Sequence, residues 1–352
     1  VLAGLGGLAD TIRLEVPALV VQVVVVPRSI DPPALAGRLD MAASHPRDSR
    51  LDCTRPVMRR WRWHPERLDD RAVAPVFKPR GVYLVTGGLG ALGRLFAREI
   101  FACAPDATVV LTGRGELDGI RREAFEALRA ELSVAEPRLV YRALDLDRAD
   151  HVEAVVAGIV AELGGLSGVL HGAGTTDDRL LLRKTAQEFS AVLAPKVAGT
   201  HHLDLATRGI ALDFFALFSS LASAMGNVGQ TDYAAANGFL DAFADHRNAL
   251  VDAGRRHGPT ISLLWPLWQD GGMRIDADAQ AGAEPQQGSG VLRDVGLVED
   301  EAHCLSEAGR RRLGKHVGFR LYRCRGDRGR GPACAAVCRM TASHYLLDIM
   351  TE

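Results

Sequence analysis

Residues 82–93 read Val-Tyr-Leu-Val-Thr-Gly-Gly-Leu-Gly-Ala-Leu-Gly, and this stretch decides the fold. Its apolar first half predicts a buried strand, and its glycines predict a tight turn into a helix. The glycines at 88, 90 and 93 fit G-x-G-x-x-G in the strand, turn and helix context that this pattern requires. Glycine lets the backbone approach a pyrophosphate, and the helix N-terminus offers the phosphates free N–H groups. The candidate dinucleotide-binding residues of the turn are Thr86, Gly87, Gly88, Leu89, Gly90, Leu92 and Gly93.

Downstream of this turn, short apolar runs alternate with longer amphipathic ones. We expect strands over 82–86, 108–112, 138–143, 168–171, 214–219 and 260–265. We expect helices over 91–104, 119–135, 148–163, 195–208 and 233–253. Alternation of this kind is typical of βαβ units. The fold class is therefore α/β, a Rossmann-type doubly wound parallel sheet.

The two ends of the chain differ from this core. Residues 1–80 carry strand-like segments at 20–26 and 56–63, and Pro75 and Pro79 indicate a domain boundary near residue 80. The strand and helix patterns fade after residue 280, so we expect a linker and an irregular tail over 281–352. Ten basic residues and one acid, Asp327, lie between 310 and 339. Such a tail could bind an acidic partner, although an irregular terminus is the simpler interpretation. Because the chain begins with Val1, we expect it to be a piece of a longer protein.

The composition is that of an ordinary globular protein. The 352 residues are 47% hydrophobic and 24% charged, with a net charge of −1, which favours neither nucleic acid nor a membrane surface. The apolar run 19–26 is far shorter than the ~20 residues of a membrane span, and no signal peptide is evident. The six cysteines lack the spacing of a zinc site or a disulfide framework. We therefore expect a cytoplasmic protein with reduced thiols and no metal, nucleic-acid or membrane partner.

The ends of three strands predict the rest of the cofactor site. An NAD site would place an acidic residue after the second strand, but the sequence there is Leu111-Thr112-Gly113-Arg114. A cation suits a 2′-phosphate and predicts NADPH, although Arg114 could be a solvated side chain and Glu116 stands close by.

After the third strand, we expect Asp145 to meet the adenine amino group and Leu146 to cover the ring. After the fourth, Ala173 and Gly174 are small enough for the backbone to pass close to the cofactor. His171 precedes them, and we interpret it as a structural histidine whose ring nitrogens are hydrogen-bonded.

A set of polar residues predicts reduction of a ketone, which requires a proton donor at the carbonyl oxygen. Ser220 follows a strand at the edge where such sheets bind ligands. Tyr233 begins a helix, and Asn237 lies one turn further on the same face. A tyrosine has a pKa of about 10, so we expect a nearby cation, Lys196, to lower it. Each residue alone has an ordinary structural interpretation, and only their joint placement favours catalysis.

Three phrases carry a resemblance to a known family: 192–200 (Val-Leu-Ala-Pro-Lys-Val-Ala-Gly-Thr), 214–220 (Phe-Phe-Ala-Leu-Phe-Ser-Ser) and 229–237 (Gly-Gln-Thr-Asp-Tyr-Ala-Ala-Ala-Asn). Together they resemble the ketoreductase domain of modular type I polyketide synthases, within the short-chain dehydrogenase/reductase superfamily. Most of that superfamily places the lysine four residues after the tyrosine. Here Asn237 holds that position and Lys196 lies upstream, the exchange that sets polyketide ketoreductases apart. The phrases at 181–185, 225–230 and 265–273 are most similar to trans-acyltransferase synthases.

The resemblance, which covers about residues 80–275, implies a role for each matching residue. Tyr233 would donate the proton to the β-keto oxygen, Ser220 would hydrogen-bond that oxygen, and Lys196 and Asn237 would hold the tyrosine and a proton-relay water. The substrate would be a β-ketoacyl chain on the phosphopantetheine arm of an acyl carrier protein, with other synthase domains as further partners. Residues 81–280 would form the catalytic NADPH-binding domain. Residues 1–80 would be the C-terminal remnant of a structural subdomain that binds no cofactor.

The resemblance also implies a stereochemical outcome. B-type members of the family carry Leu-Asp-Asp after the fourth strand, whereas this chain reads Thr175-Thr176-Asp177-Asp178, which keeps the last aspartate but not the leucine. A-type members carry Trp eight residues before the tyrosine, where this chain has Met225. With Gln230, these are the candidate stereocontrol residues, and they favour a B-type, D-configured alcohol. Asp177 and Asp178 could instead be a solvated helix cap.

Three other functions stay open at this point. The chain could be a free-standing reductase of small ketones, which would turn over a small ketone as well as a carrier-bound thioester. It could be a non-reducing scaffold or an epimerase. It could also act as an interaction module through its basic tail, which deletion of residues 305–352 would test.

Overall fold

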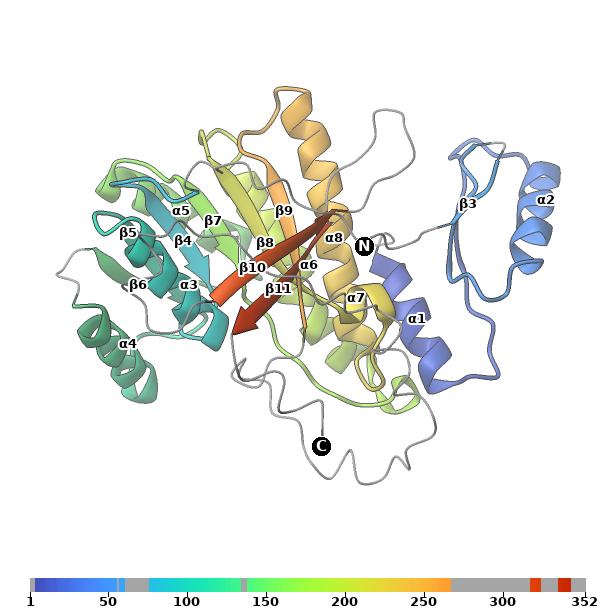
Figure 1. The fold of residues 1–352 in the computed structure, drawn as a ribbon, viewed down its shortest axis with the longest axis horizontal. Coiled ribbons are helices and arrows are strands. Elements are labelled where there is room, and N and C mark those ends of the chain that lie inside the picture. Colours follow the sequence, from blue (N-terminus) through green and yellow to red (C-terminus); the bar gives the residue numbers. More distant parts are fainter. Residues whose placement is uncertain are drawn as a thin grey trace.

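The computed structural model describes residues 4–55, 57–60, 76–133 and 138–266, with the backbone of two strands further on. Its main sheet contains six parallel strands, as predicted (Figure 1). They are β4 (Val82–Thr86), β5 (Thr108–Gly113), β6 (Leu139–Ala143), β7 (Gly168–His171), β8 (Phe214–Ser220) and β9 (Thr260–Trp265). Their spatial order, β9-β8-β7-β4-β5-β6, reverses between β4 and β7. In doubly wound folds the crevice at this reversal, beyond the carboxyl ends of the strands, is where ligands bind.

Helices cover both faces of the sheet, because alternate side chains of each strand point to opposite faces. One face packs on α3 (Ala91–Cys103) and α4 (Gly119–Leu132) through a core that includes Tyr83, Val85 and Phe96. The other packs on α5 (Ala149–Leu163), α6 (Ala186–Ala206) and α8 (Thr231–Asp252) through Leu84, Phe215 and others. The Rossmann-type α/β prediction is confirmed.

The predicted start of α6 at residue 195 is wrong. The helix begins at Ala186, where Thr185 and Glu188 form a reciprocal capping box. Pro195 lies inside the helix and is buried. Proline disfavours a helix interior because it lacks an N–H, but here the cap and the packing of both flanking turns outweigh that cost. Lys196 therefore lies in the middle of a long helix.

The N-terminal part contains two helices that the sequence analysis did not identify, α1 (Leu5–Glu15) and α2 (Pro32–Ala43). Of the strand predicted at 20–26 the structure keeps β1 (Val23–Val25), which pairs with β2 (Arg50–Asp52), and β2 pairs with β3 (Arg59–Arg60). Position 56 and residues 61–63 of the second predicted strand lie outside the described residues. Figure 1 shows α1 alongside α8, with α2 and the small sheet beyond it.

The prediction of an irregular tail is wrong in part. Strands β10 (Val317–Arg323) and β11 (Ala335–Ala342) form an antiparallel pair, and β11 pairs in parallel with β9, which would otherwise be the edge of the sheet and now lies inside an eight-stranded one. An edge strand offers unpaired backbone groups, and a further strand satisfies them. The linker predicted at 281–290 lies outside the described residues. None of the helices in the described residues is long and apolar enough to cross a membrane.

Candidate active site

The glycine turn joins β4 to α3 at the point where the strand order reverses. Gly87 adopts a φ of +67°, a backbone conformation that residues with a Cβ atom rarely adopt. A Cβ at Gly88 would meet Leu111 at 2.6 Å, and a Cβ at Gly93 would meet the Gly87 carbonyl oxygen at 2.6 Å. These two glycines therefore allow the turn to pack against its own neighbours.

Gly90 differs from these glycines, because a Cβ there would meet only one atom within 4 Å. That atom is the Gly87 oxygen, at 3.1 Å. Gly90 is also the N-cap of α3 and supplies no side-chain hydrogen bond to the helix. The first N–H groups of α3 are thus left for an anion, which fits the pyrophosphate of a dinucleotide.

His171 and Thr86 tie the two strands at this point together. The Thr86 hydroxyl and His171 Nδ1 lie 2.7 Å apart, and the Thr86 Oγ1 also accepts a hydrogen bond from the Ala173 N–H at 3.2 Å. His171 Nε2 lies 3.1 Å from the Pro195 carbonyl oxygen, and burial lowers the pKa of His171 to about 3. The structural interpretation of this histidine is confirmed.

The other predicted cofactor residues lie at the same edge. Arg114 is exposed after β5 and forms no hydrogen bond or ion pair within the described part of the chain. The Asp145 carboxylate accepts a hydrogen bond from the Asp147 N–H at 3.1 Å. Leu146 is buried in the core on the α5 side. A Cβ at Gly174 would lie 2.8 Å from the Lys196 side chain, so this glycine makes room for that lysine.

The four predicted catalytic residues come from three elements that meet beside this edge. Ser220 is the last residue of β8, and its Oγ accepts a hydrogen bond from the Ala222 N–H at 3.2 Å. The Ser220 O–H is left to donate elsewhere. Tyr233 lies in the first turn of α8, and the Asn237 amide donates to the Tyr233 carbonyl oxygen at 2.8 Å. Asn237 Oδ1 is buried and has no hydrogen-bond partner among the described residues.

Lys196 reaches this group from α6. Its ammonium donates to the Phe218 carbonyl oxygen at 2.8 Å and lies 5.8 Å from the centre of the Tyr233 ring. Burial lowers the pKa of Lys196 to about 8, and Asp241 acts in the opposite direction. The joint placement inferred from the sequence is thus present in the structure.

The expected lowering of the tyrosine pKa is wrong. Burial raises the pKa of Tyr233, although hydrogen bonds with the side chains of Ser220 and Asn237 act to lower it. The Lys196 ammonium donates its hydrogen bond to a backbone carbonyl oxygen and not to the phenol. Burial also lowers the pKa of Lys196, which disfavours its charged form. A phenol with a raised pKa keeps its proton at neutral pH.

The predicted stereocontrol residues lie where the loop after β7 meets the turn before α8. The Gln230 amide donates to the Asp178 carboxylate at 3.0 Å, and the Arg179 N–H donates to the Gly229 carbonyl oxygen at 2.8 Å. Neither Asp177 nor Asp178 is a helix cap, because Leu180 is the N-cap of the short 3₁₀ helix Leu181–Arg183 and Thr185 caps α6. Met225 ends the short helix α7 (Ala222–Met225) between β8 and α8.

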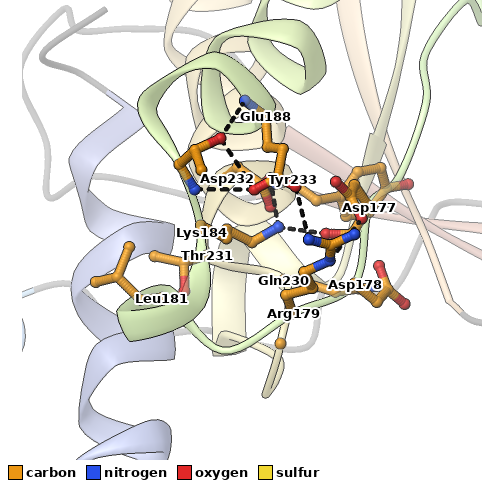
Figure 2. A network of polar contacts seen from close by, with 12 residues as sticks. Asp177, Asp178, Arg179, Leu181, Lys184, Glu188, Gln230, Thr231, Asp232 and Tyr233 are labelled. Atoms are coloured by element: carbon orange, nitrogen blue, oxygen red, sulfur yellow. Dashed lines mark hydrogen bonds and ion pairs between the residues drawn. The ribbon is translucent and has the colours of Figure 1, made fainter.

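A buried ion pair beside this loop was missed from the sequence. Lys184 Nζ lies 2.7 Å from the Asp232 carboxylate, and both side chains are 1% exposed (Figure 2). Lys184 also donates to the Asp177 carbonyl oxygen. Lys184 and Asp232 stand 48 residues apart in an unremarkable local sequence, so no pattern marked them as partners. The pair joins the loop to the first turn of α8.

A second polar cluster missed from the sequence lies below the catalytic residues on α8. The Asp241 carboxylate accepts hydrogen bonds from the hydroxyls of Ser223 at 2.5 Å and Ser262 at 2.6 Å. Burial raises its pKa. Asp245, one turn further, has its pKa raised to about 7 by burial and by Asp241. The four-residue spacing from Asn237 through Asp241 to Asp245 was the available signal, because it places all three on one side of the helix.

Comparison with known proteins identifies the family. The sequence model of the KR domain matches residues 81–270. Polyketide synthase PksL of Bacillus subtilis is 40% identical over 284 residues, which cover 79% of this chain and 6% of that protein. PksN of the same organism is 43% identical over 213 residues, 60% of this chain and 4% of that protein. The chain thus spans a small fraction of these relatives.

Solved structures give the same result. A ketoreductase domain from the bacillaene assembly line superposes with a TM-score of 0.69 at 37% identity, over 80% of this chain and 66% of that one. An N-terminal ketoreductase from the macrolactin assembly line has a TM-score of 0.61 at 29% identity, over 76% and 52% of the two chains.

Proposed function

The chain belongs to the ketoreductase (KR) domains of polyketide synthases, and from this premise we propose that it is of the trans-acyltransferase type and reduces a β-ketoacyl thioester with NADPH. The substrate would be carried on the phosphopantetheine arm of an acyl carrier protein, and the product would be the β-hydroxyacyl thioester. One observation carries the proposal. Ser220, Tyr233, Asn237 and Lys196 meet at the same sheet edge as the glycine turn.

Reduction of a ketone adds a hydride to carbon and a proton to oxygen. The dihydronicotinamide ring, when bound, supplies the hydride. Tyr233 supplies the proton: its buried phenol is protonated at neutral pH, and the Lys196 ammonium nearby offsets the burial that raises its pKa by favouring the phenolate that forms. The Ser220 side chain, which hydrogen-bonds the Tyr233 phenol in this structure, would donate its O–H to the same substrate oxygen and so stabilise the charge that develops there.

Lys196 and Asn237 would assist the return of a proton from the solvent to Tyr233 after it has donated its own. The Lys196 ammonium near the tyrosine ring stabilises the phenolate once it forms. The buried Asn237 Oδ1 is an acceptor suited to an ordered water, which would link the tyrosine to the solvent.

The choice of NADPH rests on Arg114. An exposed guanidinium without a partner among the described residues, at the end of the second strand, suits a ribose 2′-phosphate. The N-terminus of α3 and Gly90 would hold the pyrophosphate.

We propose B-type stereochemistry, which gives the D-configured alcohol. The aspartate that the B-type pattern requires, Asp178, is fixed by Gln230 at 3.0 Å, and Met225 replaces the A-type tryptophan. An acidic side chain held against the turn before Tyr233 would restrict the face from which the acyl chain enters.

The experiment combines the protein, NADPH and a β-ketoacyl pantetheine thioester, and follows loss of NADPH absorbance with chiral analysis of the product. We expect NADPH to be consumed faster than NADH, and one alcohol to dominate. A folded sample that consumes no NADPH would overturn the proposal. Equal turnover of a small ketone would favour a free-standing reductase instead.

The variant Tyr233→Phe removes the proton donor alone. We expect turnover to fall by about 10² to 10⁴-fold, because this is the usual contribution of general acid catalysis, while NADPH binding measured by fluorescence stays unchanged. The control is Tyr83→Phe, which removes a phenol that accepts from the Lys78 N–H at the opposite end of β4. Equal losses in the two variants would argue against a catalytic role for Tyr233.

A further inference from the structure

Glu15, the last residue of α1, accepts hydrogen bonds from two distant segments of the chain. One carboxylate oxygen accepts from the Gly229 N–H at 2.9 Å and from the Thr231 hydroxyl at 3.0 Å. The other accepts from the Leu181 N–H at 2.7 Å. These donors lie 166 to 216 residues from Glu15 along the chain, so the contact depends on how α1 packs against the catalytic domain.

Both segments carry residues of the active site. Leu181 belongs to the loop after β7, three residues beyond Asp178. Gly229 and Thr231 flank Gln230, and Thr231 is two residues before Tyr233. The Glu15 carboxylate therefore bridges the loop with the stereocontrol aspartate and the turn that begins the catalytic helix.

The Glu15 hydrogen bonds are among the polar interactions that hold the loop after β7 against the start of α8. The Asp178–Gln230 bond and the buried Lys184–Asp232 pair lie on one side of it (Figure 2). Helix α1 runs along the other side, near Leu181 and Thr231 in the same view. On this second side, the hydrogen bonds are accepted by Glu15, which belongs to the part of the chain before the glycine turn.

The chemistry of the bridge requires a carboxylate. All three partners are donors, so both oxygens of residue 15 must accept. A glutamine would place its NH₂ group against a backbone N–H on one side and would lose that bond. An aspartate keeps the charge, but it is one methylene shorter and cannot reach both segments.

We propose that Glu15 is a positioning residue that sets the geometry of the substrate entrance, and through it the facial selectivity of ketone reduction. This inference rests on the proposed ketoreductase function. By this account the N-terminal helix helps decide which alcohol is made, although it contributes no catalytic group.

The test compares Glu15→Gln with the wild-type full chain and with the control Asp10→Asn. Asp10 lies on the same helix and undergoes the same chemical change, but it pairs with Arg50 at 2.6 Å and does not contact the loop. Each protein is given NADPH and a β-ketoacyl pantetheine thioester. The ratio of the two alcohols, kcat, KM, the NADPH dissociation constant and the melting temperature are measured.

For Glu15→Gln we expect the alcohol ratio to fall about tenfold, which corresponds to about 1.4 kcal/mol, with a raised KM for the thioester and an unchanged NADPH dissociation constant. Asp10→Asn should keep the wild-type ratio. A lower melting temperature with an unchanged ratio and KM would overturn the proposal, because it would show a merely structural role.

If Glu15→Gln does not fold, Glu15→Asp is the variant to measure in its place. It retains the charge at the end of α1, and a shifted ratio would support the bridge, whereas a wild-type ratio would overturn it. Failure of the proposed function is distinguishable, because then the wild-type protein itself would not consume NADPH.

Discussion

Two buried lysines near the active site differ in whether they have a counter-ion. Lys184 pairs with Asp232, and both side chains are almost fully enclosed. Lys196 is also buried, but its ammonium is bonded to the Phe218 carbonyl oxygen, and burial lowers its pKa to about 8. An ammonium group without a carboxylate partner is costly to bury. The burial of Lys196 therefore costs stability, which is expected if its proposed catalytic role is what maintains it there.

The variant Lys196→Met tests this cost. Because the folded pKa lies below that of the unfolded chain, the unfolded state binds more protons between about pH 8 and 10.5, and wild-type stability rises over that range. Below pH 8 the full penalty is present. We expect Lys196→Met to increase the free energy of unfolding at pH 7 by about 1–3 kcal/mol and to lose most activity. Urea unfolding at pH 7 and pH 10 measures the difference, which should shrink at the higher pH.

The control is Lys184→Met, which removes the partner of Asp232. We expect a loss of about 3 kcal/mol, because the aspartate is left as an uncompensated buried charge. If both variants were destabilised alike at pH 7, the penalty assigned to Lys196 would be wrong.

Single residues also show how far the sequence alone could lead. Ser220, Tyr233 and Asn237 form short, specific phrases on adjacent elements, so their proximity could be inferred from the order of strands and helices. The bridge at Glu15 could not, because an acidic residue at a helix end looks like a solvated charge. Its partners become neighbours only through the packing of α1 on α8.

At the scale of the element, α8 carries a stripe of polar residues into the protein. Tyr233, Asn237, Asp241 and Asp245 follow one another at four-residue intervals. Such residues share one helical face, and here this face runs from the catalytic site to a pair of carboxyl groups. Asp245 Oδ1 is buried without a hydrogen-bond partner among the described residues.

The pKa of Asp245, raised to about 7, predicts a pH-dependent loss of stability. The unfolded aspartate ionises near pH 4 and the folded one near pH 7, so the folded state binds more protons in between and wild-type stability falls as the pH rises. We expect Asp245→Asn to match the wild type at pH 4 and to be more stable by about 2 kcal/mol at pH 8, after allowance for the partial exposure of this residue.

Thermal unfolding from pH 4 to pH 8 checks this prediction. Asp252→Asn, an exposed position at the end of the same helix, is the control and should show no such divergence. Parallel curves for Asp245→Asn and the wild type would contradict the raised pKa.

Elements were predicted well where local pattern and tertiary environment agreed. The six parallel strands were recognised because each is a short, mostly apolar run. The start of α6 was missed because proline is common in the first turn of a helix, and the capping box of Thr185 and Glu188 was not recognised. Strand β10 was overlooked although its apolar residues alternate at 317, 319 and 321, because basic residues around them resemble an irregular tail.

At the scale of the whole molecule, α1 joins the small N-terminal sheet to the catalytic domain. It packs on α8 and α7 at very short range. Cβ atoms at Gly7 would meet the Ala234 carbonyl oxygen at 2.5 Å, and Gly238 faces the Gly4 backbone in the same way. This close approach brings Glu15 within reach of the loops beside the active site.

The glycines of α1 and α2 offer a matched test of this joint. Alanine in a helix interior is favoured over glycine by about 1 kcal/mol, so Gly37→Ala in α2, where a new Cβ meets nothing within 4 Å, should stabilise the protein by about 0.5–1 kcal/mol. Gly7→Ala gains the same propensity but forces α1 away from the α8 backbone. Because overpacking costs about 1–3 kcal/mol, we expect a net loss of about 1–2 kcal/mol and a fall in turnover. Urea unfolding and the thioester assay measure both effects. Changes of opposite sign in the free energy of unfolding at the two glycines would show that the packing of α1 on α8, and not helix propensity, governs how the N-terminal part meets the catalytic domain. Equal stabilisation by both substitutions would contradict the close packing of α1.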